Sequence, residues 1–156
     1  MTILCGGQNI CGLSIGVLSL ESYFPKPPGH IKNPASLTFT TTYEILQGIT
    51  VPELLNSPTP GMLEPIVAAA RRLEKQGVRA ITGSCWFLAL FQREIAQSVS
   101  GPVFLSSLLQ VPLAYQMTRA PVGGLTASAA ELTQKHSDGA GASGVPIIVQ
   151  GLEETQ

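Results

Sequence analysis

The sequence predicts an α/β fold: a doubly wound parallel sheet with one complete N-terminal lobe and part of a second, similar lobe. Short apolar segments alternate along the chain with helical patterns, as they do where helices join parallel strands. Of the 156 residues, 44% are hydrophobic and only 12% are charged, which is typical of buried parallel strands. We expect a leader over residues 1–13, the N-terminal α/β lobe over 14–118 and the partial second lobe over 119–156.

The first strand is predicted from Ser14 to Leu20, which form a short apolar run. Residues 23–34 follow with four prolines, so they exclude a helix and favour a stiff, extended loop. Threonine and aromatic side chains predict the second strand from Ser36 to Tyr43. Residues 51–60 then form a polar connection punctuated by proline.

An amphipathic helix is expected to open at Thr59 or Pro60 and to end at Gly77, a residue that favours the left-handed backbone of a helix end. Its apolar stripe consists of Leu63, Ile66, Val67, Ala70 and Leu73. Residues 78–83 predict the third strand, and residues 87–98 predict the helix after it. That helix should bury Leu88, Phe91 and Ile95 and turn Gln92, Arg93 and Gln97 outward.

The remaining segments continue the alternation of strand and helix. Ser128 and Glu131 form a capping pattern that predicts a helix over residues 129–135. The other expected elements are a strand over 103–105, a helix over 108–117 that Pro112 kinks or delays, and strands over 122–125 and 145–150.

Charge and composition exclude several classes of function. A net charge of −1, with no basic cluster larger than Arg71-Arg72, argues against a nucleic-acid partner. Three cysteines form no disulfide framework, and the two histidines, His30 and His136, lack metal-ligand spacing. The apolar N-terminal stretch is interrupted by glycine and serine and has no basic residue before it, so it fits neither a signal peptide nor a membrane span. We therefore expect a cytoplasmic protein without a metal or membrane partner.

Cys85 is the strongest candidate for a functional residue. It follows the predicted third strand and precedes a helix, whose unpaired N–H groups favour a thiolate. The neighbouring rings of Trp86 and Phe87 could instead wall a dry pocket, which would raise the pKa of the thiol. The structural alternative is a buried cysteine that serves only as a small hydrophobic side chain.

Polar side chains gather at the predicted carboxyl ends of the strands, where open α/β sheets bind ligands. Hydroxyls together with helix N–H groups suit a carboxylate or a phosphate, although each hydroxyl could equally be a helix cap or a turn former. Glu21 is a candidate general base, and its alternative is an exposed loop carboxylate. His30 lies in the proline-rich loop and could reach a site, whereas His136 is expected at a helix end in a structural role. The candidate substrate-binding residues are Ser19, Thr42, Ser84, Ser106, Ser107, Thr126 and Ser128.

Several motifs resemble the aspartate/glutamate racemase family of the Asp/Glu/hydantoin racemase superfamily, in a C-terminally shortened form. The match runs from about Leu13 to the end of the chain, and the segment around Cys85 is its most specific part. The matching segments are 15–18, 24–29, 31–34, 63–65, 77–85, 104–108 and 122–127.

The resemblance implies two pseudo-symmetric α/β lobes with an active site between them. Members of the family use one cysteine from each lobe to move a proton on opposite faces of a carbon next to a carboxylate, without cofactor or metal. Cys85 would be the cysteine of the N-terminal lobe, Ser84 and Thr126 would contact the substrate carboxylate, and Glu21 would stand near the family's acidic residue.

The chain departs from the family at two points. Trp86 stands where this branch usually has glycine, and no cysteine occurs in the predicted second lobe. The leading hypothesis is a cofactor-independent racemase or isomerase that acts on an amino acid or related small acid through cysteine-mediated proton transfer. One alternative is a truncated, non-catalytic homologue that binds a small carboxylate or a partner subunit, and another is a subunit that completes its fold only as an oligomer. Exposed sheet edges left by a shortened fold favour a homo-oligomer.

Overall fold

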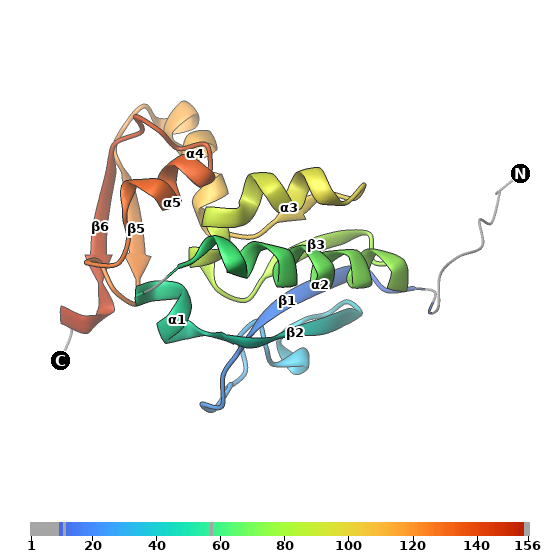
Figure 1. The fold of residues 1–156 in the computed structure, drawn as a ribbon. Coiled ribbons are helices and arrows are strands. Elements are labelled where there is room, and N and C mark those ends of the chain that lie inside the picture. Colours follow the sequence, from blue (N-terminus) through green and yellow to red (C-terminus); the bar gives the residue numbers. More distant parts are fainter. Residues whose placement is uncertain (1–9, 11, 57, 155–156) are drawn as a thin grey trace, which may run out of the picture.

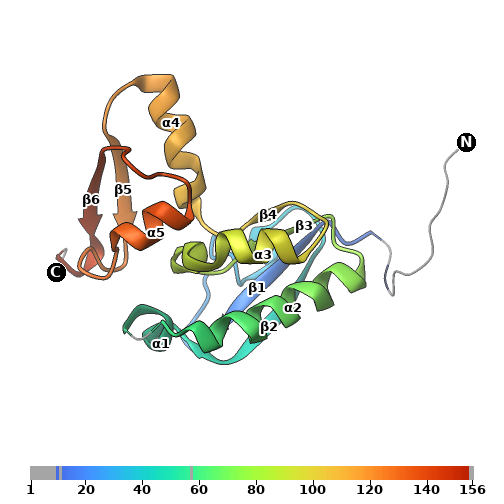
Figure 2. The same cartoon turned by 45° about the horizontal axis from the view of Figure 1, so that its top comes forward.

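The structure is a computed structural model that describes residues 10, 12–56 and 58–154. Most of the predicted leader, including Cys5 and Cys11, lies outside these residues. Figures 1 and 2 show two bodies of unequal size, a larger one with four strands and a smaller one with two. The strands are β1 (Ile15–Glu21), β2 (Thr41–Thr50), β3 (Ala80–Gly83), β4 (Val103–Phe104), β5 (Val122–Thr126) and β6 (Ile147–Gly151). The α-helices are α1 (Val51–Asn56), α2 (Leu63–Gln76), α3 (Gln92–Ser98), α4 (Val111–Thr118) and α5 (Gln134–Gly139).

The larger body is a parallel sheet with the strand order β2-β1-β3-β4. Helices α2 and α3 lie side by side on one face of this sheet (Figure 2). Leu18 and Leu20 of β1 pack into the core beneath them, and both are almost fully buried. Gly16 lets α2 approach closely, because a Cβ at this position would lie 3.0 Å from Cδ1 of Leu73. Because all four strands are parallel, their carboxyl ends meet at one edge of the sheet.

The prediction of α2 is confirmed in its apolar stripe and in its end. Ile66, Ala70 and Leu73 are fully buried. Gly77 has the left-handed backbone that the sequence requires, with φ of 96°. The helix itself begins at Leu63, because residues 60–62 form a preceding turn of 3-10 helix. Helix α2 has 14 residues, and none of the helices in the described residues is long and apolar enough to cross a membrane.

The second strand was predicted wrongly, since β2 covers residues 41–50 rather than 36–43. Residues 34–36 form a 3-10 turn, in which the Asn33 side chain accepts a hydrogen bond from the N–H of Ala35. Pairing with β1 starts only at Thr41, opposite Ile15. The predicted polar connection after this strand also differs, because residues 51–56 form helix α1. The correction moves Thr42 from the carboxyl end of a strand to the amino end of one.

The predicted helix over 87–98 divides into two parts. Residues 86–91 form a 3-10 helix, here called η3, and α3 begins at Gln92. Leu88, Phe91 and Ile95 are buried as predicted. The outward position predicted for Gln92 is wrong, because this side chain is buried against β4. Its amide donates to the carbonyl of Val103 and accepts from the N–H of Leu105, each at 2.9 Å.

The smaller body pairs β5 with β6 in parallel, and α5 packs against η3 of the larger body. The helix predicted over 129–135 is wrong, since α5 starts at Gln134. Ser128 closes a turn instead of capping a helix, because its N–H donates to Oγ1 of Thr126 at 3.2 Å. His136 is the third residue of the six-residue α5, where it forms a capping box with Thr133 and also belongs to the last turn. The predicted α/β class, with a parallel sheet and a partial second lobe, is confirmed.

Candidate active site at the carboxyl end of β3

Cys85 is separated from β3 by Ser84 and lies directly before η3, with extended backbone at φ −143° and ψ 128°. The residue is partly exposed and lines a hollow of about 250 Å³. This hollow, called the Cys85 hollow below, is formed by Ile31, Thr82, Gly83, Ser84, Cys85, Trp86, Phe104, Leu105, Ser106 and Ser107. Cys85 therefore borders a space of the size of a small ligand at the edge of the sheet where the strands end.

Two opposing influences act on the Cys85 thiol. Burial raises the pKa of the thiol and is the largest influence. A hydrogen bond from the backbone N–H of Phe87 and the positive charge of Lys32 lower it. Because burial outweighs the other two, the thiol is predominantly protonated at neutral pH. Burial in a dry pocket thus affects the pKa of the Cys85 thiol more than the helix N–H groups do. The sequence alone leaves open which of the two effects is larger.

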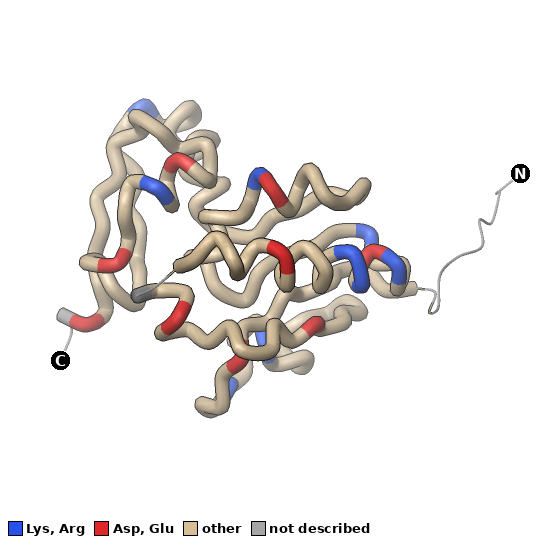
Figure 3. The backbone as a smooth tube through the Cα atoms, viewed as in Figure 1, with Lys and Arg blue, Asp and Glu red and all other residues tan. Residues whose placement is uncertain are grey.

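Lys32 is the residue of this site that sequence analysis missed. Its ammonium donates to the carbonyl oxygen of Leu20 and to Oγ of Ser22. Burial and the charge of Lys26 lower the pKa of Lys32, whereas the nearby Cys85 raises it. The largest group of Lys and Arg residues lies around the carboxyl end of α2 (Figure 3), at the opposite edge of the sheet. The available signal was the segment 31–34, which matches a family motif without marking Lys32 as special.

Hydrogen bonds hold Lys32 and its loop in place. The Asn33 amide donates to the carbonyl of Lys26 at 2.8 Å, and the Tyr43 hydroxyl donates to the carbonyl of Ile31 at 2.9 Å. His30 also belongs to this loop, and its Nδ1 accepts from the N–H of Lys32 at 3.0 Å. The proline-rich segment therefore folds back across the carboxyl end of β1.

Three of the predicted hydroxyl residues line the Cys85 hollow: Ser84, Ser106 and Ser107. The Ser84 hydroxyl accepts from the N–H of Leu20 at 3.0 Å, and the Ser106 hydroxyl accepts from the N–H of Leu108 at 3.2 Å. Ser107 is exposed. An accepting hydroxyl still has its own proton to donate, so these side chains suit an anionic ligand.

The other predicted binding residues do not line this hollow. Ser19 is buried within β1, and Thr42 lies at the amino end of β2, where its hydroxyl donates to Oε1 of Gln76 at 3.1 Å. Thr126 and Ser128 bond to each other at the end of β5. The set of hydroxyl residues that lines the Cys85 hollow is therefore smaller than the set that the sequence predicted.

Glu21 is engaged in holding two strands together. Its carboxylate accepts from the Tyr23 hydroxyl at 2.5 Å and from the N–H of Gly48 at 2.8 Å. These two hydrogen bonds lower the pKa of Glu21, so the carboxylate is ionised at neutral pH. Gly48 has φ of 73° and lies where the pairing of β1 with β2 shifts register. Glu21 thereby fastens the end of β1 to this irregularity and does not line the Cys85 hollow.

Trp86 connects the Cys85 hollow with a second one of about 270 Å³. The second hollow includes Val122 to Leu125 of β5, and both hollows share Trp86 and Ser107. The indole therefore stands at the boundary between the larger body and β5. Among the described residues, no group of three or more His, Cys, Asp and Glu side chains could hold a metal ion.

Comparisons by sequence relate the chain to lyases. No family model matches it. It is 33% identical over 100 residues to dimethylsulfoniopropionate lyase 6 of Emiliania huxleyi (strain CCMP1516). This alignment covers 64% of this chain and 26% of that protein. It is also 33% identical over 107 residues to a dimethylsulfoniopropionate lyase of Durusdinium sp. clade D, covering 67% and 35%. The alignments with these two curated relatives thus span about a quarter to a third of their length.

Comparisons by structure relate the fold to decarboxylases and racemases. A glycine-to-cysteine mutant of arylmalonate decarboxylase in the sulfate ion associated form has a TM-score of 0.60 at 15% identity, covering 92% of this chain and 64% of that one. An aspartate racemase homologue from Pyrococcus horikoshii OT3 has a TM-score of 0.52 at 15% identity, covering 90% and 66%. The chain therefore shares the fold of arylmalonate decarboxylase and of an aspartate racemase homologue, as the motifs predict.

Proposed function

From the racemase-superfamily fold of this chain, we propose that Cys85 is the base of a cofactor-independent site that removes a proton next to the carboxylate of a small acid. The observation that carries the proposal is the position of Cys85 at the end of β3, where it lines a hollow of about 250 Å³. This volume suits a small acid, because larger organic ligands occupy pockets of about 300 Å³ or more. The hydroxyls of Ser84, Ser106 and Ser107 would hold the carboxylate, and the nearby charge of Lys32 would favour an anion in the hollow.

A thiol with a raised pKa can serve as this base. Only a small fraction of it is ionised at neutral pH, but the thiolate that forms is strongly basic. The Phe87 N–H and the Lys32 charge favour that thiolate. Activity should therefore increase as the pH rises through the pKa of Cys85.

The sequence likeness to dimethylsulfoniopropionate lyases supports a β-sulfonio carboxylate as the substrate. In this reaction the thiolate takes the proton next to the carboxylate, and the electron pair of that C–H bond forms a C=C bond. The bond from carbon to the sulfonium sulfur breaks at the same time, and dimethyl sulfide leaves with the electron pair of that bond. A single base on one face is sufficient, so this chemistry needs no second cysteine opposite Cys85, whereas racemisation by two bases does.

Trp86 supports a cationic substrate. An aromatic face attracts a cation such as a sulfonium, and tryptophan does so most strongly. Trp86 lines the same hollow as Cys85. The residue that departs from the racemase pattern thus fits a substrate with a positive charge close to the reacting carbon.

The test is release of dimethyl sulfide from dimethylsulfoniopropionate by the full chain, measured by gas chromatography of the headspace. We expect release by the unchanged protein and its loss in Cys85→Ser. In Trp86→Leu we expect KM to rise about tenfold with a smaller change in kcat, because the ring binds the cation. Exchange of the proton next to the carboxylate in D2O, followed by NMR for a panel of amino and hydroxy acids, tests racemase-type chemistry in parallel.

The dominant effect of burial on the Cys85 thiol favours one alternative, a homologue that binds a small carboxylate without converting it. Binding without dimethyl sulfide release or proton exchange would support this alternative and exclude the enzyme. Release that persists in Cys85→Ser would exclude Cys85 as the base.

A further inference from the structure

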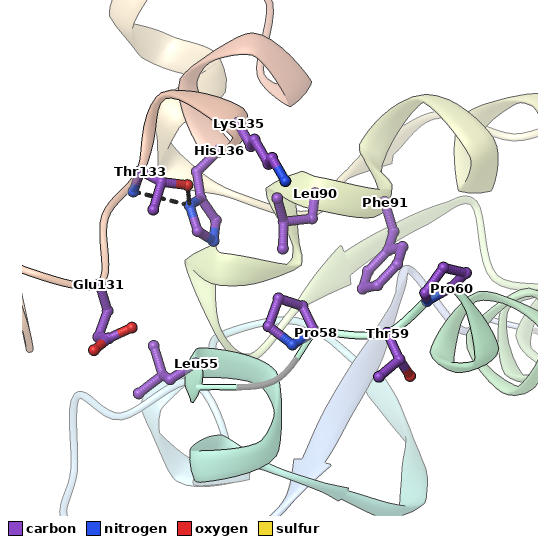
Figure 4. A pocket seen from close by; sticks show the side chains of 10 residues that line it. All are labelled: Leu55, Pro58, Thr59, Pro60, Leu90, Phe91, Glu131, Thr133, Lys135 and His136. Carbon is purple, nitrogen blue, oxygen red and sulfur yellow. Dashed lines mark hydrogen bonds between the residues drawn. The ribbon is translucent and has the colours of Figure 1, made fainter.

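A larger cavity, of about 470 Å³, lies between the two bodies and shares no lining residue with the Cys85 hollow. Its walls come from α1, the segment before α2, the end of η3, the residues that lead into α5 and the first turn of α5 (Figure 4). Leu55, Pro58, Leu90 and Phe91 make much of the surface apolar. We call this space the His136 cavity.

His136 is buried at the edge of the cavity, with 3% of its surface exposed. Its ring meets the ring of Phe87 edge to face, with centroids 4.9 Å apart. Nδ1 accepts a hydrogen bond from the backbone N–H of Thr133 at 3.2 Å. Because a backbone N–H can only donate, Nδ1 is unprotonated and the proton of the neutral ring resides on Nε2.

The Nε2–H group is a buried donor, and none of the described residues gives it a partner. Figure 4 shows the Nε2 edge of the ring turned toward the space between Glu131, Leu90 and Pro58, while the Nδ1 edge faces Thr133. A buried donor without a partner is unfavourable, and an acceptor atom of a ligand removes this cost.

We propose that the His136 cavity binds a small monocarboxylate with an apolar body. His136 Nε2–H donates to a carboxylate oxygen, and the exposed ammonium of Lys135 supplies the opposite charge. The side chains of Leu90, Phe91 and Pro58 pack against the apolar body. Glu131 also lines the cavity and disfavours further negative charge there, so dicarboxylates should bind more weakly than monocarboxylates. This site requires neither Cys85 nor its chemistry.

The test uses the full chain labelled with ¹⁵N, with phenylacetate as the probe and NMR detection of the His136 ring nitrogens. We expect phenylacetate to shift the Nε2 resonance. Phenylacetamide and succinate should bind at least about fivefold more weakly than phenylacetate. Lys135→Gln should weaken phenylacetate binding about fivefold, whereas Lys75→Gln, a matched change of an exposed lysine in the last turn of α2, should leave it unchanged.

His136→Phe keeps an aromatic ring against Phe87 and should abolish binding. If this variant does not fold, the Nε2 resonance and the two lysine variants still decide the question. Cys85→Ser should retain phenylacetate binding in full. The proposal is overturned if Nε2 does not shift at roughly 50 mM phenylacetate, if both lysine variants bind equally, or if Cys85→Ser abolishes binding. The last result would locate the acid in the Cys85 hollow, so failure of this proposal is distinguishable from failure of the proposed function.

Discussion

At Cys85, the strand end that exposes the thiol to a ligand also surrounds it with apolar neighbours. Burial raises the pKa of the thiol, and the Phe87 N–H and the charge of Lys32 only partly offset that effect. Lys32 is fixed by hydrogen bonds to Leu20 and Ser22, so its charge is held near the thiol without a direct ion pair. The loop residue thus tunes the reactivity of the cysteine at the end of β3.

Lys32→Met should slow alkylation of Cys85. Removing the positive charge raises the pKa of the thiol further, so we expect the rate with iodoacetamide at pH 7 to fall about threefold. The modified residue is identified by peptide mass spectrometry. Lys26→Met is the matched control, because the Lys26 ammonium lies 4.3 Å from the Phe24 ring centroid and is not among the groups that influence the thiol. Equal rates in the two variants would contradict the role of Lys32.

Stability should fall as the pH is lowered through the range where His136 titrates. Burial lowers the pKa of His136, and the negative charge of Glu131 only partly offsets this effect. The unfolded chain therefore takes up a proton first, near pH 6.5, and stability is lost from there down to the folded pKa. We expect a loss of up to about 1 kcal/mol between pH 7.5 and 5.5 in urea unfolding.

His136→Phe should flatten this pH dependence. His30, whose pKa is also lowered by burial and by nearby lysines, remains in both proteins and cancels in the comparison. An unchanged slope in His136→Phe would show that His136 does not titrate differently on folding.

At the scale of elements, a side chain takes the place of strand pairing at the edge of the sheet. Strand β4 is only two residues long, and the Gln92 amide bonds to the backbone on both sides of Phe104. This clamp joins α3 to the strand end that carries Ser106 and Ser107. It therefore positions one wall of the Cys85 hollow.

Gln92→Leu should destabilise the protein by about 1–3 kcal/mol, because the carbonyl of Val103 and the N–H of Leu105 lose their partner in a buried position. The measurement is the free energy of unfolding in urea. Gln97→Leu, an exposed position on the same helix, is the control and should change stability by less than about 0.5 kcal/mol. Equal effects of the two substitutions would refute the clamp.

Elements with strong local patterns were predictable from the sequence. The stripe of α2 and its end at Gly77 depend on neighbouring residues alone. Strand β2 was misplaced because the turn at residues 34–36 and the pairing with β1 decide where it begins. Helix α5 was misplaced because Ser128 and Thr133 are both possible helix caps. Thr126 accepts a hydrogen bond from the N–H of Ser128 in a turn, and Thr133 is the residue that caps the helix.

The candidate site was predictable in part for the same reason. Ser84, Cys85 and Ser106 lie within two residues of a strand end, so the parallel sheet alone brings them together. Lys32 reaches the site through a loop whose path depends on contacts with distant residues such as Tyr43. Such contacts leave no periodic signal in the sequence.

At the scale of the whole molecule, two sheet surfaces carry exposed apolar side chains. Ile45 is 58% exposed and Phe104 44% exposed, and the pairing register places both on the sheet face opposite α2. Leu125 and Ile148 are 74% and 66% exposed on one face of the β5–β6 pair. Surfaces of this kind favour association, which supports the expected homo-oligomer.

We expect self-association that weakens when the face of the small sheet is made polar. Sedimentation velocity of the unchanged chain should show an oligomer that dissociates on dilution. The double change Leu125→Lys and Ile148→Lys should lower the association constant about tenfold or more, because it places charges in a desolvated contact. A single monomeric species at every concentration would exclude association.

Trp86 borders both the Cys85 hollow and the hollow beside β5, and it is the single tryptophan of the chain. The molecule thus contains an intrinsic fluorophore beside its reactive sulfur, and emission excited at the red edge of protein absorbance comes from this one position. Acrylamide quenching and shifts of the emission maximum report how wet that position is, without any label. Occupancy of either hollow becomes readable as a spectral change.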